Sequence, residues 1–596
     1  MKKCFAASVI AGLLASNSIA IADKIEDDER PNIVVILADD LGYSDIGSYG
    51  SEINTPNIDQ LAAEGLRFSN YRSSASCAPS RAMLLTGVDS HRAGVANIPE
   101  ALTPEQARSP FYNGSLNHNV VTIATLLMKA GYHTNMVGKW HLGYNNNSLK
   151  PINRGFEQTL MMPFSGGDNW TNQSYLPHYE KTLWFKNGKE IPLPGDFYSS
   201  KFIVDNVIKQ LENNRNNTAS DKPFFTYVSF LAVHIPVQAP KEYTDKYIET
   251  YSDGWTALRK RRQQAVKELG LVRADTPMKK MNSTEDWGKL SAEQKRYHTK
   301  SMAVYAGMID AMDFHIGRLI NYLKEIDEYD NTVFIFTSDN GAEPSDPGRI
   351  SKAFPLTRSF LGYNADYETL GEKYSYNFIG RNFASAASSP FGHYKFHSGE
   401  GGLRVPMIIS GPALSEELQG QINHGKAYVK DLAPTILSLA GTEHPGTEYQ
   451  GNTIEPSTGI NLHPVINGQE ETVYDIKDII AYEIGGNAAL IKGDYKIILN
   501  RGKYDDGQWH LYNVTLDPGE TTELDKIQPA IFSDLLNEYE SYAKSNGVIP
   551  VPKKYIQTRQ IAINGLKAIF SAEIVLFAIG LISLIAFIIY WRRKTT

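Results

Sequence analysis

Two clusters of oxygen ligands each follow a strongly apolar run in the sequence. Asp39 and Asp40 come directly after the apolar run 32–38 (NIVVILA). Asp339 and Asn340 follow the apolar run 333–337, with one serine between. Carboxylate and amide oxygens suit a hard cation such as Ca²⁺ or Mg²⁺, whereas Zn²⁺ favours cysteine and histidine. An isolated acidic pair more often closes a turn or caps a helix. Because the second cluster also follows an apolar run, the two together favour a metal site over a turn or a cap.

Basic and imidazole side chains at similar positions indicate chemistry on an anion. Lys139 and His141 stand at the end of one apolar segment, and His234 stands at the end of another. Lys139, Lys395 and Arg81 have the charge and the donors to bind a tetrahedral oxyanion. His141 and His234 titrate near neutral pH and are candidates for general base and general acid. Each of these residue types, taken alone, is more often structural or solvent-exposed.

Cys77 lies in the run 76–81 (SCAPSR). Pro79 suits the first turn of a helix that begins here, which places Cys77 beside backbone N–H groups that favour anions. An unmodified cysteine in this position is a candidate low-pKa thiolate nucleophile. If a signal peptide that contains Cys4 is removed, Cys77 has no partner for a disulfide in the same chain.

The reactive residues end strands that alternate with helical segments. This alternation predicts an α/β fold, with a large, mixed, mainly parallel sheet flanked by helices. Because sites in open α/β sheets form at the carboxyl ends of the strands, we expect the reactive residues to meet there. The strands that we expect in this sheet are 32–38, 132–138, 224–233, 333–337 and 406–410.

The domain organisation follows from changes in pattern along the 596 residues. We assign residues 30–470 to a catalytic domain, within which the highly charged segment at about 241–300 reads as a mostly helical surface insertion. Residues 471–546 carry short strand patterns and a closing helix, which predicts a smaller C-terminal α+β subdomain with an antiparallel sheet. Residues 547–571 then form a linker.

Both ends of the chain indicate export. Residues 1–22 are typical of a signal peptide, with two lysines, a short apolar stretch and a cleavage site of the A-x-A kind. The uncharged run 574–591 is about long enough to cross a bilayer, and we assign a transmembrane helix to 572–591. Three cations within 592–596 place this tail in the cytoplasm. We expect the catalytic domain outside the cytoplasm, in the periplasm if the host is Gram-negative; a buried core helix is the alternative for the apolar run.

Composition excludes other classes of protein. Hydrophobic residues make up 42% and charged residues 21% of the chain, as in globular proteins. The net charge of −7 argues against a nucleic-acid partner, because nucleic-acid-binding proteins are normally basic.

Several motifs together resemble those of the type I sulfatases, the formylglycine-dependent family that includes bacterial arylsulfatases. Residues 77–87 (CAPSRAMLLTG) resemble the signature C-x-P-S-R-x-x-L-L-T-G of that family, and 138–143 (GKWHLG) resemble its second signature. The resemblance spans about residues 30–546, includes the insertion near 241–300, and implies the alkaline-phosphatase-like sulfatase fold. Further matches are 38–42 (ADDLG), 233–236 (VHIP), 338–341 (SDNG), 395–406 (KFHSGEGGLRVP) and 517–520 (DPGE).

The resemblance implies a role for each candidate residue. A formylglycine-generating maturation enzyme would oxidise Cys77, and the hydrated aldehyde would attack the sulfur of a sulfate ester. Lys139 and Lys395 would bind the sulfate. His234 would protonate the leaving oxygen, and His141 would take the proton from the second hydroxyl so that inorganic sulfate is released. Arg81 would hold the formylglycine and the metal ligands in place. The ligands of Ca²⁺, with Mg²⁺ as the alternative ion, would be Asp39, Asp40, Cys77 as formylglycine, Asp339 and Asn340.

Two other functions stay open at this point. A formylglycine-dependent phosphonate or phosphoester hydrolase would share the sheet and the anion pocket, and a substrate panel separates it from a sulfatase. A catalytically silent, membrane-tethered protein that binds sulfated glycans would arise if Cys77 is never oxidised, although a binding protein has no use for both His141 and His234. For a sulfatase, we expect cleavage of aryl sulfates in vitro. The natural ester would be a sulfated sugar or another small organic sulfate.

Overall fold

A computed structural model of the chain describes residues 30–217, 222–350, 352, 354–569, 580, 581 and 583. The predicted signal peptide at 1–22 and the predicted tail at 592–596 lie outside these residues. Only residues 580, 581 and 583 of the predicted transmembrane helix at 572–591 are described. Within the described part, no helix is long and apolar enough to cross a bilayer. The assignments at the two ends of the chain therefore stay predictions.

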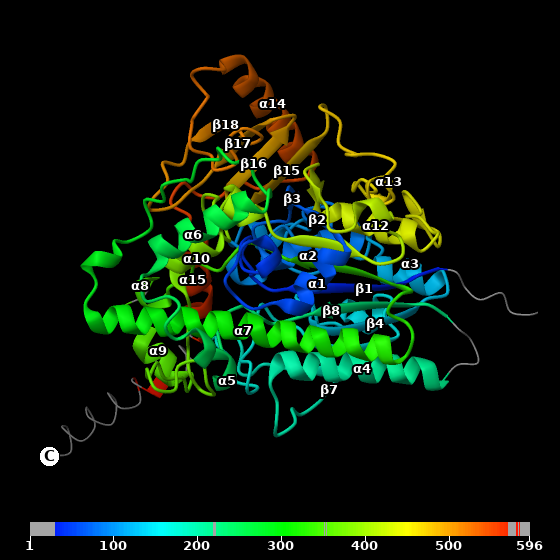
Figure 1. The fold of residues 1–596 in the computed structure, drawn as a ribbon, viewed down its shortest axis with the longest axis horizontal. Helices are drawn as coiled ribbons and strands as arrows, with labels where there is room; N and C mark the ends of the chain where they lie inside the picture. The colour runs from blue at the N-terminus through cyan, green and yellow to red at the C-terminus, as the bar shows by residue number, and fades with distance from the viewer. Residues whose placement is uncertain are drawn as a thin grey trace, which may run out of the picture.

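A ten-stranded mixed sheet forms the centre of the molecule (Figure 1). Strand β1 lies between β8 and β9, and all three run parallel. Strands β4 and β5 continue the parallel part beyond β8, whereas β10 pairs antiparallel with β9 and with β2. From one edge to the other the order is β11 (Ile422–Asn423), β2 (Leu66–Phe68), β10 (Met407–Ser410), β9 (Thr332–Ser338), β1 (Asn32–Ala38), β8 (Phe224–Ser229), β4 (His133–Lys139), β5 (Gln158–Met162), β6 (Phe185–Lys186) and β7 (Lys189–Glu190).

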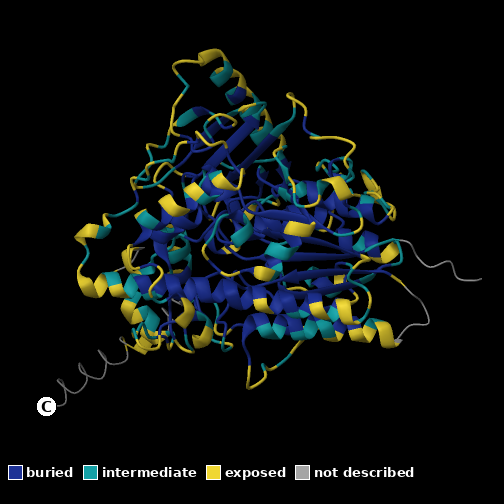
Figure 2. Ribbon diagram, viewed as in Figure 1, coloured by how far each residue is buried: buried dark blue, intermediate teal, exposed yellow. Residues whose placement is uncertain are grey.

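Alternate side chains of β1 enter two hydrophobic cores, one on each face of the sheet. Val34 and Ile36 belong to one core, and Ile33 and Val35 belong to the other. Burial on both faces explains why this strand is continuously apolar in the sequence. Figure 2 shows the buried sheet and the exposed outer sides of the helices. The first core is covered by α1 (Pro56–Glu64), α4 (Ser199–Asn217) and α7 (Ala292–Glu325), and the second by α2 (Cys77–Thr86), α3 (Ile123–Lys129) and α12 (Leu432–Leu439).

The charged segment near 241–300 is mostly helical, as expected, but it is not confined to the surface. Arg262 in α6 is 1% exposed, donates to Glu52 at 2.9 Å and pairs with Asp45. Because two acids compensate its charge, part of this basic run folds inward. The segment forms α5 (Lys241–Thr244), α6 (Trp255–Glu268) and the start of α7. The other helices outside the C-terminal part are α8 (Pro347–Ile350), α9 (Phe354–Phe360), α10 (Gly380–Ala387), α11 (Glu400–Leu403) and α13 (His463–Ile466).

The C-terminal part forms a four-stranded antiparallel sheet covered by one helix. Residues of each strand pack with Leu535 of α14 in a small core of their own. Together with the central sheet, this confirms the predicted fold class. Residues 557–569, within the segment assigned to a linker, form α15 (Gln557–Ile569). The strands are β15 (Ile479–Ile484), β16 (Asn487–Lys492), β17 (Tyr495–Leu499) and β18 (Trp509–Asn513), followed by α14 (Pro529–Ser545).

A buried network of ion pairs joins this subdomain to the central domain. Lys496 of β17 lies 2.7 Å from Glu400 Oε1 and 2.7 Å from Glu520 Oε1, and none of the three side chains is exposed. Glu400 also pairs with Arg72 at 2.7 Å and with Arg404. Charges removed from water depend on their partners, so this network links the folding of the two parts.

Replacing Lys496 by Met should lower the free energy of unfolding by about 3–5 kcal/mol, because two buried carboxylates lose their shared cation. The matched control is Lys492→Met, which removes pairs with the exposed side chains of Asp534 and Glu538 and should cost less than about 1 kcal/mol. Urea unfolding followed by tryptophan fluorescence measures both changes. Equal losses in the two variants would contradict the role given to the buried network.

Candidate active site

The strand ends that carry the predicted residues meet at one edge of the central sheet. Strands β9, β1, β8 and β4 are neighbours and run parallel, so their carboxyl ends lie together. All ten predicted residues are at most 4% exposed. Nine of the ten are joined to one another by hydrogen bonds and ion pairs, and His141 stands outside this network. The nine are Asp39, Asp40, Cys77, Arg81, Lys139, His234, Asp339, Asn340 and Lys395.

Two buried lysines face buried carboxylates in the site. Lys139 Nζ lies 2.8 and 2.7 Å from the two oxygens of Asp39. Lys395 Nζ lies 2.7 Å from Asp40 Oδ1 and 2.9 Å from Glu343 Oε2. Burial raises the pKa of Asp39 well above its ordinary value despite Lys139. Burial works to lower the pKa of Lys395, but Asp40 and other neighbouring groups raise it well above its ordinary value. Burial also works to lower the pKa of Lys139, but Asp39 and other neighbouring groups raise it above its ordinary value. Both lysines therefore stay charged, and the acids of the site or a bound anion balance their charge.

Arg81 connects helix α2 to the second acidic cluster. It lies one helical turn after Cys77, so the two side chains share a face of the helix. Its Nε and Nη2 donate to Asp339 Oδ2 at 2.9 and 2.7 Å. Its Nη1 donates to the backbone oxygen of Lys139 at 3.0 Å and to Ser229 Oγ. Burial works to raise the pKa of Asp339, but Arg81 holds it below its ordinary value, so Asp339 remains an anion.

The acidic cluster fits a hard divalent cation. Ligand atoms of Asp39, Asp40, Cys77 and His234 all lie within 4.8 Å of one another. Asn340 Nδ2 donates to Asp40 Oδ1 at 2.7 Å, while its buried Oδ1 has no hydrogen-bond partner among the described residues. Buried carboxylates and a free amide oxygen make a donor set of mainly oxygen, as Ca²⁺ and Mg²⁺ require.

Cys77 is the first residue of α2, at the end of the helix that favours negative charge. Its Sγ lies 3.8 Å from Asp40 Oδ1. Burial raises the pKa of the Cys77 thiol well above its ordinary value. The structure therefore does not support the expected low-pKa thiolate, and the unmodified side chain is a poor nucleophile.

His234 presents one ring nitrogen to the site. Its Nδ1 donates to the backbone oxygen of Ile235 at 2.6 Å, which leaves Nε2 at 3.6 Å from Asp40 Oδ2. Burial, followed by the charges of Lys395 and Lys139, holds the pKa of His234 well below its ordinary value. A negatively charged ligand bound between His234 and the two lysines would raise the pKa of His234.

His141 follows β4 with a positive φ of 56°, in the left-handed region. Residues other than glycine rarely adopt this conformation, and it often occurs at functional sites. The nearest acid is Glu100, whose Oε2 lies 3.8 Å from His141 Nε2. Burial lowers the pKa of His141 to about 4, so its neutral form can accept a proton.

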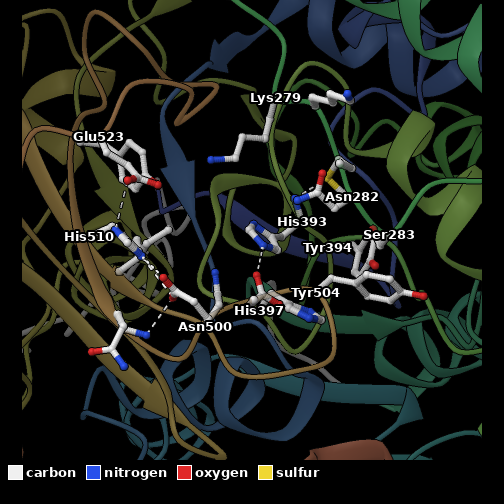
Figure 3. A pocket seen from close by; sticks show the side chains of 17 residues that line it. Lys279, Asn282, Ser283, His393, Tyr394, His397, Asn500, Tyr504, His510 and Glu523 are labelled. Carbon is white, nitrogen blue, oxygen red and sulfur yellow. Dashed lines mark hydrogen bonds and ion pairs between the residues drawn. The ribbon is translucent and has the colours of Figure 1, made fainter.

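The C-terminal subdomain holds the loop that presents Lys395. His393 Nε2 pairs with Asp505 Oδ1 at 2.9 Å, and the backbone N–H of Ser398 donates to Asn500 Oδ1 at 2.7 Å. Figure 3 shows His393 and Asn500 among the side chains around a pocket of about 290 Å³. Lys395 lies between His393 and Ser398 in the sequence, and its own side chain contacts Asp40 of the central domain. Contacts with the C-terminal subdomain and with the central domain therefore position Lys395 together.

Sequence reasoning missed three residues that contact the site. Glu343 lies three residues after Asn340, so its closeness to a motif was an available signal. Ser229 is the last residue of β8, but the predicted strand ran on to residue 233, so the rule of strand ends pointed to His234 and not to Ser229. Glu100 lies in a short 3₁₀ turn outside every motif that we considered, and no signal in the sequence pointed to it.

Comparison with known proteins identifies the family. The family model for sulfatases matches residues 31–442, which is more than half of the chain. An uncharacterized sulfatase of Schizosaccharomyces pombe is 36% identical over 551 residues, covering 90% of this chain and 97% of its own length. The arylsulfatase of Klebsiella aerogenes is 33% identical over 470 residues, covering 78% of this chain and 97% of its own length.

Solved structures show the same architecture. The crystal structure of Ps i-CgsB matches with a TM-score of 0.60 and 25% identity, covering 91% of this chain and 98% of that protein. The motifs, the site at the strand ends and these similarities agree. The chain belongs to the sulfatase family and is a sulfuric ester hydrolase.

Proposed function

We propose that the protein hydrolyses sulfate monoesters, as an arylsulfatase-like enzyme, through a formylglycine made from Cys77 and a bound Ca²⁺. The observation that supports this most is the place of Cys77. It lies at the N-terminus of α2, 3.8 Å from Asp40, among buried acids and lysines. Because burial keeps the unmodified thiol protonated, the sulfur atom itself has little use there.

The proposed reaction needs two groups that are not among the encoded side chains, a formylglycine and a bound cation. Formylglycine supplies a hydrated aldehyde, in which one hydroxyl attacks the sulfur and the other allows the sulfate to be released. A bound cation would supply positive charge that stabilises the nucleophile and the sulfate. The residues that would hold the cation are Asp39, Asp40, Cys77 as formylglycine, Asp339 and Asn340.

The encoded side chains neutralise the sulfate. Cleavage of a sulfate ester depends more on stabilising negative charge than on a strong base. Lys139 and Lys395 are buried, so their charges are not screened by water and act strongly on a bound anion. Arg81 keeps Asp339 ionised and in position, which leaves the two lysines for the substrate.

Two histidines would move the protons. His234 Nδ1 is held by the oxygen of Ile235, so Nε2 is the atom that would donate to the leaving oxygen. The negative charge of the sulfate would raise the pKa of His234 from its depressed value. His141 is neutral, with a pKa of about 4, and would accept the proton from the second hydroxyl.

The proposal extends to substrate and compartment. The Klebsiella aerogenes relative is an arylsulfatase, and Ps i-CgsB has been crystallised in complex with k-i-k-neocarrahexaose. We propose that this protein cleaves aryl sulfates in vitro and that its natural ester is a sulfated sugar or another small organic sulfate. An exported catalytic domain, anchored through 572–591, accounts for the apolar run and the cations that follow it.

The tryptic peptide 73–81 from protein made in its native host should have the mass of an aldehyde, or its hydrate, at Cys77. Mass spectrometry measures this directly, and the peptide carries no other cysteine. An intact thiol in all of the protein would contradict the proposal and favour a binding protein instead.

Replacing His234 by Ala should reduce kcat/KM most for esters with poor leaving groups. A general acid contributes about 10²–10⁴-fold when the leaving oxygen needs a proton and much less when it does not. A series of aryl sulfates with graded leaving-group pKa measures the difference. The same loss across the series would remove His234 from the acid role. Aryl phosphates in the same series test the phosphoester alternative.

Replacing Asp339 by Asn should remove the cation and lower kcat by about 10²-fold or more, because the site loses negative charge and transition-state stabilisation together. Metal content measured by mass spectrometry should fall in parallel with activity. The control is Asp330→Asn on the exposed loop before β9, which should keep both. Full activity in metal-free wild-type protein would contradict a catalytic cation.

A further inference from the structure

Glu100 and His141 are two buried side chains that face each other with polar atoms free of hydrogen bonds. Glu100 is 4% and His141 3% exposed. Glu100 Oε2 and both ring nitrogens of His141 have no hydrogen-bond partner within the described ranges. The nearest opposite group for each is the other, at 3.8 Å between Oε2 and Nε2. Leaving such groups unpaired costs free energy, which a closer approach of the two side chains would recover.

The second oxygen of Glu100 is fixed by a tyrosine. Tyr179 donates its hydroxyl to Glu100 Oε1 at 2.5 Å. The ring of Tyr179 stacks on Phe164, with centroids 4.0 Å apart, so the hydroxyl is held in direction. The carboxylate can therefore turn only Oε2 towards His141. The pKa of Glu100 is lowered to about 2: burial opposes this, but the pairing with His141 and Tyr179 outweighs it.

The C-terminal segment around α15 holds the turn that carries Glu100. Asn564 Nδ2 donates to the backbone oxygens of Glu100 and Leu102, at 2.9 and 3.0 Å. Tyr555 donates to the oxygen of Ala101 at 2.8 Å, and Gln557 donates to Asn97 Oδ1 at 3.0 Å. Residues more than 450 positions away in the sequence thus fix both ends of this turn.

We propose that Glu100 is a positioning residue for His141, and that the segment 555–564 keeps it in place. A buried carboxylate beside an imidazole fixes the orientation of the ring and stabilises the imidazolium that forms when the ring accepts a proton. His141 is neutral in its buried pocket, so it gains most from a fixed negative charge at the moment of transfer. The proposal rests on the proposed role of His141 as proton acceptor.

A double-mutant cycle in the full-length, matured enzyme tests the pair. Glu100→Gln should lower kcat by about 10- to 100-fold, a part of the 10²–10⁴-fold that a positioned base supplies, and should leave KM within about 2-fold. In a His141→Ala background the same substitution should change kcat by less than about 2-fold, because residues that act as a unit are not additive. The control is Glu105→Gln, on the same segment but exposed, which should leave kcat unchanged.

Removing the supports tests the second half of the proposal. Tyr179→Phe and Asn564→Ala leave the charge of Glu100 in place, and each should lower kcat by about 3- to 10-fold in the wild-type background only. Thermal unfolding of each variant shows that the fold is kept. Equal losses from Glu100→Gln in both backgrounds, or unchanged kcat in Glu100→Gln, would overturn the proposal. Wild-type kcat in His141→Ala alone would instead overturn the role of His141 in the proposed function.

Discussion

The burial of opposite charges at one edge of a hydrophobic sheet is the constraint on which the rest of the structure depends. Asp39, Asp40 and Asp339 lie in a pocket with Lys139 and Arg81, and each of the five is at most 1% exposed. Removing any one charge would leave a partner uncompensated in a medium where that costs several kcal/mol. The scaffold must therefore hold these groups at contact distance. A loose arrangement would let water replace the pairs.

The fold meets this constraint by bringing rigid ends together. Neighbouring parallel strands deliver Asp39, Lys139 and Asp339, and helix α2 delivers Cys77 with Arg81 one turn later. The sixth charge, Lys395, comes from a loop, and loops are more mobile than strands. This explains the contacts from the C-terminal subdomain to both sides of that loop, and the buried network around Lys496 that attaches the subdomain. The distal sheet thus contributes to the active site without supplying a side chain to it.

Much of this arrangement could be predicted because it depends on local patterns. An apolar run buried on both faces predicts a central strand, and the rule of strand ends accounts for six of the nine residues in the network; Cys77, Arg81 and Lys395 come from α2 and from a loop. The pKa of Cys77 could not be predicted, because it depends on burial by segments far away in the sequence. The inward turn of Arg262 depends on Glu52 and Asp45, more than 200 positions earlier. Glu100 could not be predicted for the same reason, because its partners come from the turn after β4, from the segment near residue 179 and from α15.

A count of charges shows what the pocket is built to accept. When all four buried acids are ionised, Glu343 included, they face three buried cations, which leaves one negative charge in excess. A bound cation would favour the ionised form of Asp39, whose pKa burial raises. Under the proposed function, a divalent cation turns this into one positive charge, and the protonated His234 adds a second. A sulfate monoester, which carries one negative charge, then lowers the sum to one positive charge. Glu100 lies outside this count, and its counter-charge appears only when His141 accepts a proton. The charges that hold the site together would then favour an anionic ester as the substrate, and Glu100 would draw the proton towards His141.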